Sequence, residues 1–286
     1  MTTVGFVGLG NMGAVLAANL VAAGHEVATH DRAGPARSPD GARFVPDLAE
    51  VGRVADVVVL SLPDGAVAEQ VATTLATVEG RRVAHVVDTS TSGVAASQSI
   101  GARLADAGIG FVDAPVSGGV AGARARTLSV MYAGTDADCA AVDAVLSGLS
   151  DRTRRVGDRP GMGQGLKLLN NFLSATALAA TSEAIAFGRT LGLDLATMLE
   201  VLNASSGQSA ATTDKFPNHV LTEAYAAGFA NALMAKDVRL YLEAVRDQAG
   251  PSVLAPVTAA VWDRFAEAEP GADFTRIFPF VEGGSA

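Results

Sequence analysis

The first half of the chain alternates short apolar runs with longer segments in which apolar residues recur at helical spacing. The apolar runs are rich in Val and nearly continuous, as in DVVVLSL, which is typical of parallel strands buried on both faces of a sheet. Segments such as NMGAVLAANLVAAG lie between them and predict helices. We therefore expect an α/β, doubly wound sheet. Its predicted strands cover residues 4–9, 26–31, 56–62, 83–90, 110–114 and 127–134.

The pattern changes after about residue 157, and no convincing strand is predicted beyond it. The stretch that begins GMGQGLKLLNN predicts mostly one long helix, longer than an ordinary domain needs. Several further helices follow, with breaks expected at residues 203–207, 215–219 and 247–251. The sequence thus predicts an α/β domain at residues 1–160, a connecting helix at 161–192 and an all-α domain at 193–286.

Composition narrows the possible partners and location. With 49% apolar and 18% charged residues, the 286-residue chain is typical of a globular protein. Its net charge of -9 disfavours an extended nucleic-acid or anionic-membrane surface. The single cysteine, Cys139, fits a reducing compartment, and neither a membrane span nor a secretory signal is recognisable. We expect a cytoplasmic protein that binds neither nucleic acid nor membrane.

A glycine-rich motif joins the first predicted strand to the first predicted helix. Gly8, Gly10 and Gly13 form G-x-G-x-x-G, a motif that allows a tight turn, backbone approach to a pyrophosphate and close helix packing. Asp31 ends the second strand 18 residues after Gly13, near the offset of an acid that binds the adenosine ribose. This context predicts a Rossmann-type nucleotide site. The residues expected to contact cofactor there are Gly8, Leu9, Gly10, Asn11, Met12, Gly13, Asp31 and Arg32.

The same segment bears on the choice between NAD and NADP. The Asp31 carboxylate would accept hydrogen bonds from the ribose 2′-hydroxyl and repel a 2′-phosphate, which favours NAD. Arg32 and Arg37 point the other way, because a guanidinium pairs well with phosphate. We expect NAD, and NADP stays possible.

A pair of adjacent glycines follows the fifth predicted strand, in DAPVSGG at residues 113–119. Adjacent glycines are kept where the backbone turns sharply or comes close to another group. Backbone N–H groups without side chains in the way can reach a small anion. A plain strand-to-loop turn would explain the glycines, but not the serine beside them.

Six motifs in order give the chain a resemblance to a known family. They are GFVGLGNMG, SLPDGAV, DTSTS, DAPVSGGVAGA, GMGQGLKLLNN and MAKDVRLYLEA. The chain resembles the β-hydroxyacid dehydrogenases, which include 3-hydroxyisobutyrate dehydrogenases and tartronate semialdehyde (2-hydroxy-3-oxopropionate) reductases. The resemblance implies reversible, NAD(P)-dependent oxidation of a short-chain 3-hydroxy acid to its semialdehyde or oxo acid.

The resemblance also implies roles for individual residues. Ser117 and the backbone of Gly118 and Gly119 would bind the substrate carboxylate. Lys167 would be the general acid–base, and Asn171, four residues further along the same helical face, would bind the substrate hydroxyl. Leu62, Pro63, Thr91, Phe229 and Lys236 would contact the cofactor. Asp237, adjacent to Lys236 on a helix and not expected to face it, would support the pocket.

The resemblance implies no metal, a small carboxylic acid as substrate, and a homodimer or homotetramer built through the long helix, with the helical domain closing the site. Arg124 and Arg126 depart from the family pattern, which often has a glycine before TL. They could recognise a second anionic group on the substrate or be solvated turn residues.

Three alternative functions are considered: an imine reductase on the same fold, a phosphogluconate dehydrogenase, and a non-catalytic cofactor-binding regulator. Lys167 argues against an imine reductase, and the short helical half of the chain argues against a phosphogluconate dehydrogenase.

Overall fold

The computed structural model describes residues 2–284 of the chain. The chain divides into two compact units, Met1–Lys167 (the N-terminal unit) and Leu168–Ala286 (the C-terminal unit). Each unit has a hydrophobic core of its own. The boundary between them falls inside one long helix, α7 (Met162–Thr190), which therefore contributes residues to both.

The N-terminal unit is built on a nine-stranded sheet. Six neighbouring strands, in the order β3-β2-β1-β4-β5-β6, are parallel. The strand order reverses between β1 and β4, and ligands of such sheets bind beyond the carboxyl ends of the strands at this point. The expected doubly wound fold is confirmed. The strands are β1 (Thr3–Val7), β2 (Glu26–His30), β3 (Arg43–Phe44), β4 (Val57–Leu60), β5 (His85–Asp88), β6 (Gly110–Asp113), β7 (Val116–Ser117), β8 (Ser129–Ala133) and β9 (Arg152–Gly157).

One end of the sheet differs from the parallel arrangement expected throughout. β8 is antiparallel to both β6 and β7 and parallel to β9. The chain turns back after β6 without a long crossover helix, and such short connections join antiparallel strands. The sequence also failed to predict β3, β7 and β9. β3 and β7 have two residues each, and β9 has the sequence RTRRVG, whose arginines suit a sheet edge that pairs on one side.

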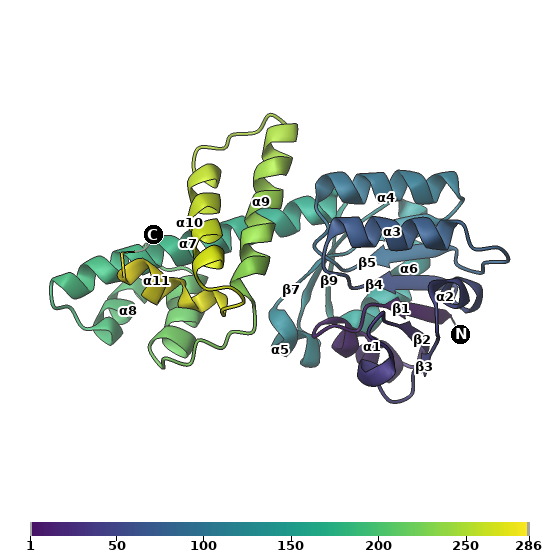
Figure 1. The fold of residues 1–286 in the computed structure, drawn as a ribbon, viewed down its shortest axis with the longest axis horizontal. Coiled ribbons are helices and arrows are strands. Elements are labelled where there is room, and N and C mark those ends of the chain that lie inside the picture. The colour runs from purple at the N-terminus through teal and green to yellow at the C-terminus, as the bar shows by residue number, and fades with distance from the viewer. Residues whose placement is uncertain (1, 285–286) are drawn as a thin grey trace. The chain divides into compact units, whose positions relative to one another are not determined.

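Helices cover both faces of this sheet and create two core layers. Leu16 and Leu20 of α1 and Val142 and Leu146 of α6 pack with Phe6 in one layer. The other layer lies under α2, α3 and α4, and Figure 1 shows α3 and α4 side by side over the sheet. The helices are α1 (Gly13–Ala22), α2 (Leu48–Val54), α3 (Gly65–Ala76), α4 (Val94–Asp106), α5 (Gly119–Arg124) and α6 (Asp136–Leu149).

The C-terminal unit is helical, as expected, apart from an isolated bridge between Ala230 and Asp273. Trp262, Phe216 and Phe265 are fully buried in its core. The break expected at residues 215–219 is wrong, because these residues lie within a π-helix that contains Pro217. The elements after α7 are α8 (Leu195–Asn203), the π-helix η2 (Ala211–Val220), α9 (Asn231–Asp247), α10 (Ala255–Ala268), the 3₁₀-helix η3 (Phe274–Arg276) and α11 (Ile277–Glu282).

No helix among residues 2–284 combines the length and the apolar character needed to cross a membrane. Over the same residues, no group of three or more His, Cys, Asp and Glu side chains could hold a metal ion.

Candidate active site

The glycine-rich loop lies between β1 and the N-terminus of α1. Gly8 has φ +96°, and a Cβ there would lie 2.2 Å from the carbonyl oxygen of Ser61. A Cβ on Gly13 would lie 2.0 Å from the carbonyl oxygen of Gly8, so the fold itself requires both glycines. Gly10 differs, because nothing lies within 4 Å of its Cβ position. The space over Gly10 therefore fits the close approach of a pyrophosphate.

The N-terminus of α1 also suits a phosphate. Met12 occupies its N-cap and, within the described part of the chain, forms no side-chain cap hydrogen bond. Backbone N–H groups at a helix N-terminus are an anion site when no side chain satisfies them. The loop thus fits a dinucleotide by shape and by hydrogen bonding.

Asp31 follows β2 and ties its segment to the glycine-rich loop. One carboxylate oxygen accepts a hydrogen bond from the Leu9 N–H at 2.5 Å, and the other accepts from the Ala33 N–H at 2.7 Å. Arg37 donates to the Asn11 side-chain oxygen at 3.0 Å, while Arg32 is exposed. The expected ribose-binding acid is therefore held beside the loop that carries the expected phosphate site.

The residues expected to line the nicotinamide half follow neighbouring parallel strands. Leu62 and Pro63 come after β4, and Thr91 comes after β5. The Leu62 N–H donates to the Ser90 hydroxyl at 2.8 Å, which joins the two connections. Since parallel strands end at one edge of the sheet, the N-terminal unit brings these residues to the edge where the glycine-rich loop lies.

The expected carboxylate loop begins at β7. Ser117 is half-buried, whereas Gly118 and Gly119 are exposed. Their φ angles are +130° and +66°, values that side chains rarely adopt, which explains the glycine pair. Nothing lies within 4 Å of the Cβ position of Gly119, so its backbone is open to approach.

Lys167 lies in the second turn of α7 and is buried, with 8% of its surface exposed. Three residues earlier on the same helix, the backbone N–H of Gln164 donates a hydrogen bond to Asp113 Oδ2 at 2.8 Å. Asp113 ends β6, and its Oδ1 is buried without a hydrogen-bond partner among the described residues. Burial raises the pKa of Asp113 to about 7, and the nearby Asp88 carboxylate adds to the rise.

Neither Gln164 nor Asp113 was assigned a role from the sequence, although Asp113 belongs to a motif quoted above. Gln164 is fully buried, and its side chain makes hydrogen bonds to the loop that follows β5. Both residues stand inside motifs already singled out, DAPVSGG and GMGQGLK. Their position within these motifs was the one available signal.

The C-terminal unit contains the remaining expected site residues. Asn171 is buried, and its Nδ2 donates to Asp237 Oδ2 at 2.6 Å. Lys236 Nζ lies 3.3 Å from Asp237 Oδ1, so the expectation that these neighbours do not face each other is wrong; the long lysine side chain reaches back. The Phe229 ring packs edge-to-face on Phe274 with centroids 5.7 Å apart.

Arg126 and Arg124 are placed differently. The Arg126 guanidinium donates to the carbonyl oxygens of Gly148 at 2.8 Å and Ser147 at 3.0 Å, and it pairs with Asp151 at 3.0 Å. It thereby caps the end of α6. Arg124 is exposed at the end of α5. Of these two arginines, Arg126 is thus bound to the end of α6, and Arg124 is exposed.

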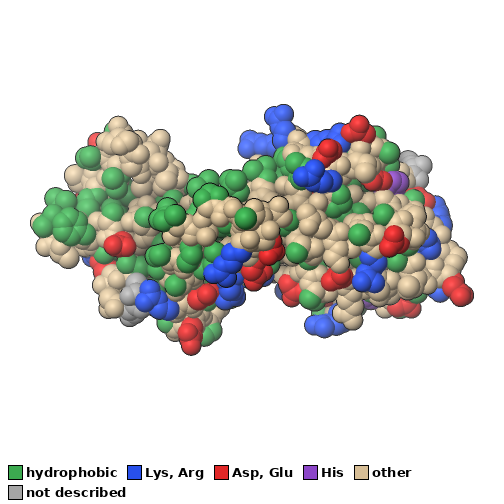
Figure 2. Space-filling view, turned by 90° about the horizontal axis from the view of Figure 1, so that it is seen from above, with side chains coloured by type: hydrophobic (Ala, Val, Ile, Leu, Met, Phe, Trp, Pro, Cys, Tyr) green, Lys and Arg blue, Asp and Glu red, His purple; other side chains and the backbone are tan. Residues whose placement is uncertain are grey.

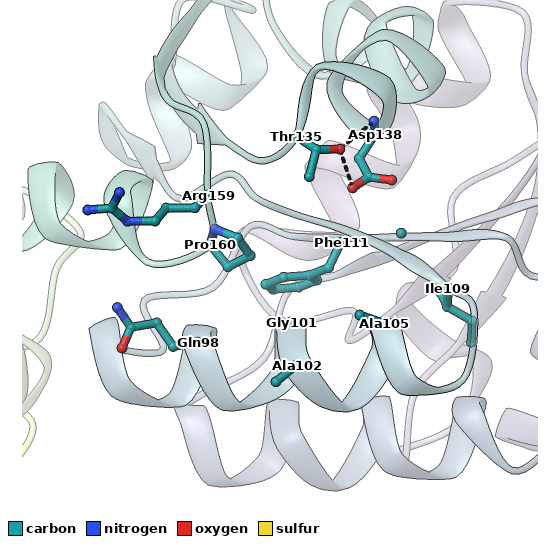
Figure 3. A pocket seen from close by; sticks show the side chains of 11 residues that line it. Gln98, Gly101, Ala102, Ala105, Ile109, Phe111, Thr135, Asp138, Arg159 and Pro160 are labelled. Atoms are coloured by element: carbon teal, nitrogen blue, oxygen red, sulfur yellow. Dashed lines mark hydrogen bonds between the residues drawn. The ribbon is translucent and has the colours of Figure 1, made fainter.

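A hollow of about 390 Å³ lies elsewhere on the N-terminal unit, between α4, β6 and the Arg159–Pro160 turn. Figure 3 shows Phe111 and Pro160 among the side chains that line it, and the hydrogen bonds between Thr135 and Asp138, which also line it. None of the expected site residues lines it. The hollow is therefore separate from the candidate active site.

Comparison with known proteins shows the family to which the chain belongs. Residues 3–157 match the family model described as the NAD binding domain of 6-phosphogluconate dehydrogenase. Residues 161–281 match the one described as NAD-binding of NADP-dependent 3-hydroxyisobutyrate dehydrogenase. The chain is 33% identical over 299 residues to the 3-hydroxyisobutyrate dehydrogenase of Pseudomonas aeruginosa, covering 99% of both. It is 35% identical over 246 residues to the mitochondrial enzyme of that name from Drosophila melanogaster, covering 83% of this chain and 76% of that one.

Solved structures show the same likeness. The Mycobacterium tuberculosis 3-hydroxyisobutyrate dehydrogenase with L-serine has a TM-score of 0.90 at 31% identity, covering 98% of this chain and 99% of that one. An imine reductase from Myxococcus stipitatus has a TM-score of 0.65 at 18% identity, covering 98% of this chain and 99% of that one, and shares the fold alone.

The sheet topology, the glycine-rich loop and the matching models together define an oxidoreductase that uses NAD(P). The chain belongs to the β-hydroxyacid dehydrogenase family, as its motifs indicated. Relatives across nearly its whole length are dehydrogenases that are named for a CH–OH donor. A non-catalytic regulator is therefore set aside, and the imine reductases are more distant than the dehydrogenases.

Proposed function

We propose that this enzyme interconverts a short-chain 3-hydroxy acid and its semialdehyde or oxo acid, with Lys167 as general acid–base. The single observation that carries the proposal is the burial of Lys167 on α7, within the motif GMGQGLKLLNN through which the chain resembles the β-hydroxyacid dehydrogenases. Substrates of the 3-hydroxyisobutyrate or 2-hydroxy-3-oxopropionate type fit this role, because both carry a carboxylate and an alcohol or aldehyde two bonds away.

In the proposed mechanism, NAD(P) supplies or accepts the hydride at the alcohol carbon. Ser117 and the backbone N–H groups of Gly118 and Gly119 bind the substrate carboxylate and fix its distance from the reacting carbon. Lys167 in its neutral form accepts the hydroxyl proton during oxidation, and its ammonium form returns that proton during reduction.

Asn171 is proposed to bind the same hydroxyl. The hydrogen bond from its Nδ2 to Asp237 fixes the orientation of the amide. The proposed cofactor contacts of Phe229 and Lys236 rest on the family resemblance. Phe229 supports this less directly, since its ring already packs against Phe274.

We propose NAD as the preferred cofactor. The Asp31 carboxylate is anchored by two backbone N–H groups beside the glycine-rich loop, where a fixed negative charge opposes a 2′-phosphate. Arg32 and Arg37 are both exposed; Arg37 donates a hydrogen bond to Asn11, and Arg32 is the cation next to Asp31 that could favour NADP.

A homo-oligomer is proposed from exposed apolar side chains on the part of α7 within the C-terminal unit. Leu173 is 59% and Phe187 65% exposed, and Leu191, directly after the helix, is 62% exposed; exposed apolar surface of this kind marks interaction sites. Figure 2 shows hydrophobic side chains gathered on the C-terminal unit. A cytoplasmic location remains a prediction from the single cysteine.

The test is nicotinamide absorbance recorded with purified protein, a panel of short hydroxy acids, and NAD or NADP. The panel contains 3-hydroxyisobutyrate, glycerate, serine, threonate, and phosphonate and sulfonate analogues. Turnover of a plain 3-hydroxy carboxylate with NAD is expected. Activity confined to doubly anionic acids would bring Arg124 into the substrate site, and silence across the panel would contradict the substrate class.

A further inference from the structure

The side chain of Gln164 connects α7 to the loop after β5, and both lie in the N-terminal unit. Gln164 Oε1 accepts hydrogen bonds from the backbone N–H groups of Ser92 at 3.1 Å and Gly93 at 3.2 Å. Gln164 Nε2 donates to the carbonyl oxygen of Ser90 at 2.9 Å. We call these three hydrogen bonds the Gln164 clamp. Thr91 lies between two of these partners, Ser90 and Ser92, in the sequence.

The Gln164 clamp is buried, and its loss would leave buried backbone N–H and carbonyl groups without hydrogen-bond partners. Gln164 has 0% of its surface exposed, and Ser90 and Ser92 are 5% and 2% exposed. Buried donors and acceptors that lose a partner keep the full cost of desolvation. The loop and the helix are therefore strongly coupled at this point, although 72 residues separate Gln164 from Ser92 in the sequence.

The backbone of Gln164 is fixed as well as its side chain. Its N–H donates to Asp113 Oδ2 at 2.8 Å, so one residue is attached both to the loop after β5 and to the end of β6. A helix rotates by about 100° and rises about 1.5 Å per residue. Attachment at Gln164 therefore sets both the rotation and the height of Lys167, three residues further along α7.

We propose that Gln164 is a positioning residue, which sets the place of Lys167 relative to the loop that carries Thr91. The inference rests on the acid–base role proposed for Lys167 and on the cofactor contact proposed for Thr91. Gln164 itself touches neither substrate nor cofactor in this account. Its contribution is alignment, and misplacement by about 1 Å can lower a rate by about a hundredfold.

The test compares Gln164→Met, which has nearly the same volume but cannot form the clamp, with Gln70→Met on the exposed surface of α3. The first readout is amide hydrogen exchange of the protein without cofactor. Protection of the Ser92 and Gly93 N–H groups should fall in Gln164→Met and stay unchanged in Gln70→Met.

The second readout is steady-state kinetics on the best substrate. In Gln164→Met, kcat should fall about 10- to 100-fold while the KM for NAD changes less than about threefold. A deuterium isotope effect on kcat should appear or grow, because a misaligned lysine slows the chemical step. Gln70→Met should match the wild type in kcat, in the KM for NAD and in the isotope effect.

Wild-type kcat and isotope effect in a folded Gln164→Met would overturn the inference, as would parallel losses of kcat and NAD affinity. If Gln164→Met does not fold, Gln164→Asn takes its place, since it keeps the amide but is too short to reach the loop, and the same outcomes decide. Failure of the proposed function is distinct: Lys167→Met would then retain wild-type turnover.

Discussion

Gly10 and Gly13 stand three residues apart in one loop, yet their surroundings assign them different tasks. A Cβ on Gly13 would collide with the backbone of the same loop, whereas a Cβ on Gly10 would point into open space. The fold therefore requires Gly13, whereas we propose that Gly10 is needed for the approach of the cofactor. The motif alone does not separate these tasks, because it contains only the spacing of the glycines.

This difference gives a prediction for two alanine variants. Gly13→Ala should lower the free energy of unfolding by roughly 1–3 kcal/mol or more, because the backbone must shift. Gly10→Ala should leave that free energy unchanged to within about 0.5 kcal/mol while raising the Kd for NAD about tenfold or more. Urea unfolding and calorimetric titration measure the two quantities. Equal loss of stability in both variants would contradict the assignment.

Asp113 gives a second prediction, on pH dependence. Its carboxyl has a pKa of about 7 in the folded chain, against an ordinary value of 3.8. Between these values the folded chain binds the extra proton, so the free energy of unfolding falls as pH rises from about 4 to about 7 and then levels off. The contribution is on the order of 4 kcal/mol.

Asp113→Asn should flatten this part of the profile, because the amide can still accept from the Gln164 N–H but does not titrate. Urea unfolding at several pH values measures the effect. Asp47→Asn is the matched control, since Asp47 caps the N-terminus of α2 from an exposed position. A decline between pH 4 and 7 that persists unchanged in Asp113→Asn would refute the account.

At the scale of elements, the pattern of apolar residues was sufficient to predict a strand or helix wherever apolar residues filled the strand or recurred along one face of the helix. The Val-rich runs predicted β4 and β5, and the long apolar periodicity predicted α7 within two residues at each end. β9 was missed because its arginines resemble a loop, and η2 because Pro217 normally ends a helix.

The candidate site likewise contains residues that the sequence pointed out and contacts that it could not. Motif spacing and family resemblance drew attention to Ser117 and Lys167, whose roles remain proposals. The Gln164 clamp could not be predicted, because it depends on the juxtaposition of residues far apart in sequence. Sequence patterns report local periodicity, and such contacts arise only when the sheet has formed.

The start of α7 supplies a prediction at this scale. A Cβ on Gly163 would lie 2.6 Å from the Met131 carbonyl oxygen and 2.8 Å from Asp113 Oδ2, whereas one on Gly165 would meet only Val94 at 3.9 Å. Gly163→Ala should therefore destabilise the chain by about 1–3 kcal/mol. Gly165→Ala, in the same helix turn, should stabilise it by about 0.5–1 kcal/mol. Urea unfolding distinguishes them, and destabilisation by both would show that α7 packs differently.

At the scale of the whole molecule, the exposed apolar side chains of α7 predict self-association. Leu173→Asp combined with Phe187→Asp should lower the mass measured by analytical ultracentrifugation, because each change places a charge in the proposed interface. Leu221→Asp is the control, since Leu221 is 44% exposed directly after η2 and lies outside α7. A wild type that sediments as a monomer, or a doubly substituted chain that keeps its mass, would contradict the proposed interface.

Membership of the dehydrogenase family covers the whole chain, while the assignment of the chemistry depends on one side chain. The most direct measurement is therefore the rate of NADH formation from the best 3-hydroxy acid by the wild type and by Lys167→Met, with NAD affinity measured in parallel. We expect kcat/KM to fall about 10²- to 10⁴-fold in Lys167→Met while NAD affinity is retained. Comparable turnover by both proteins would show that another group moves the proton.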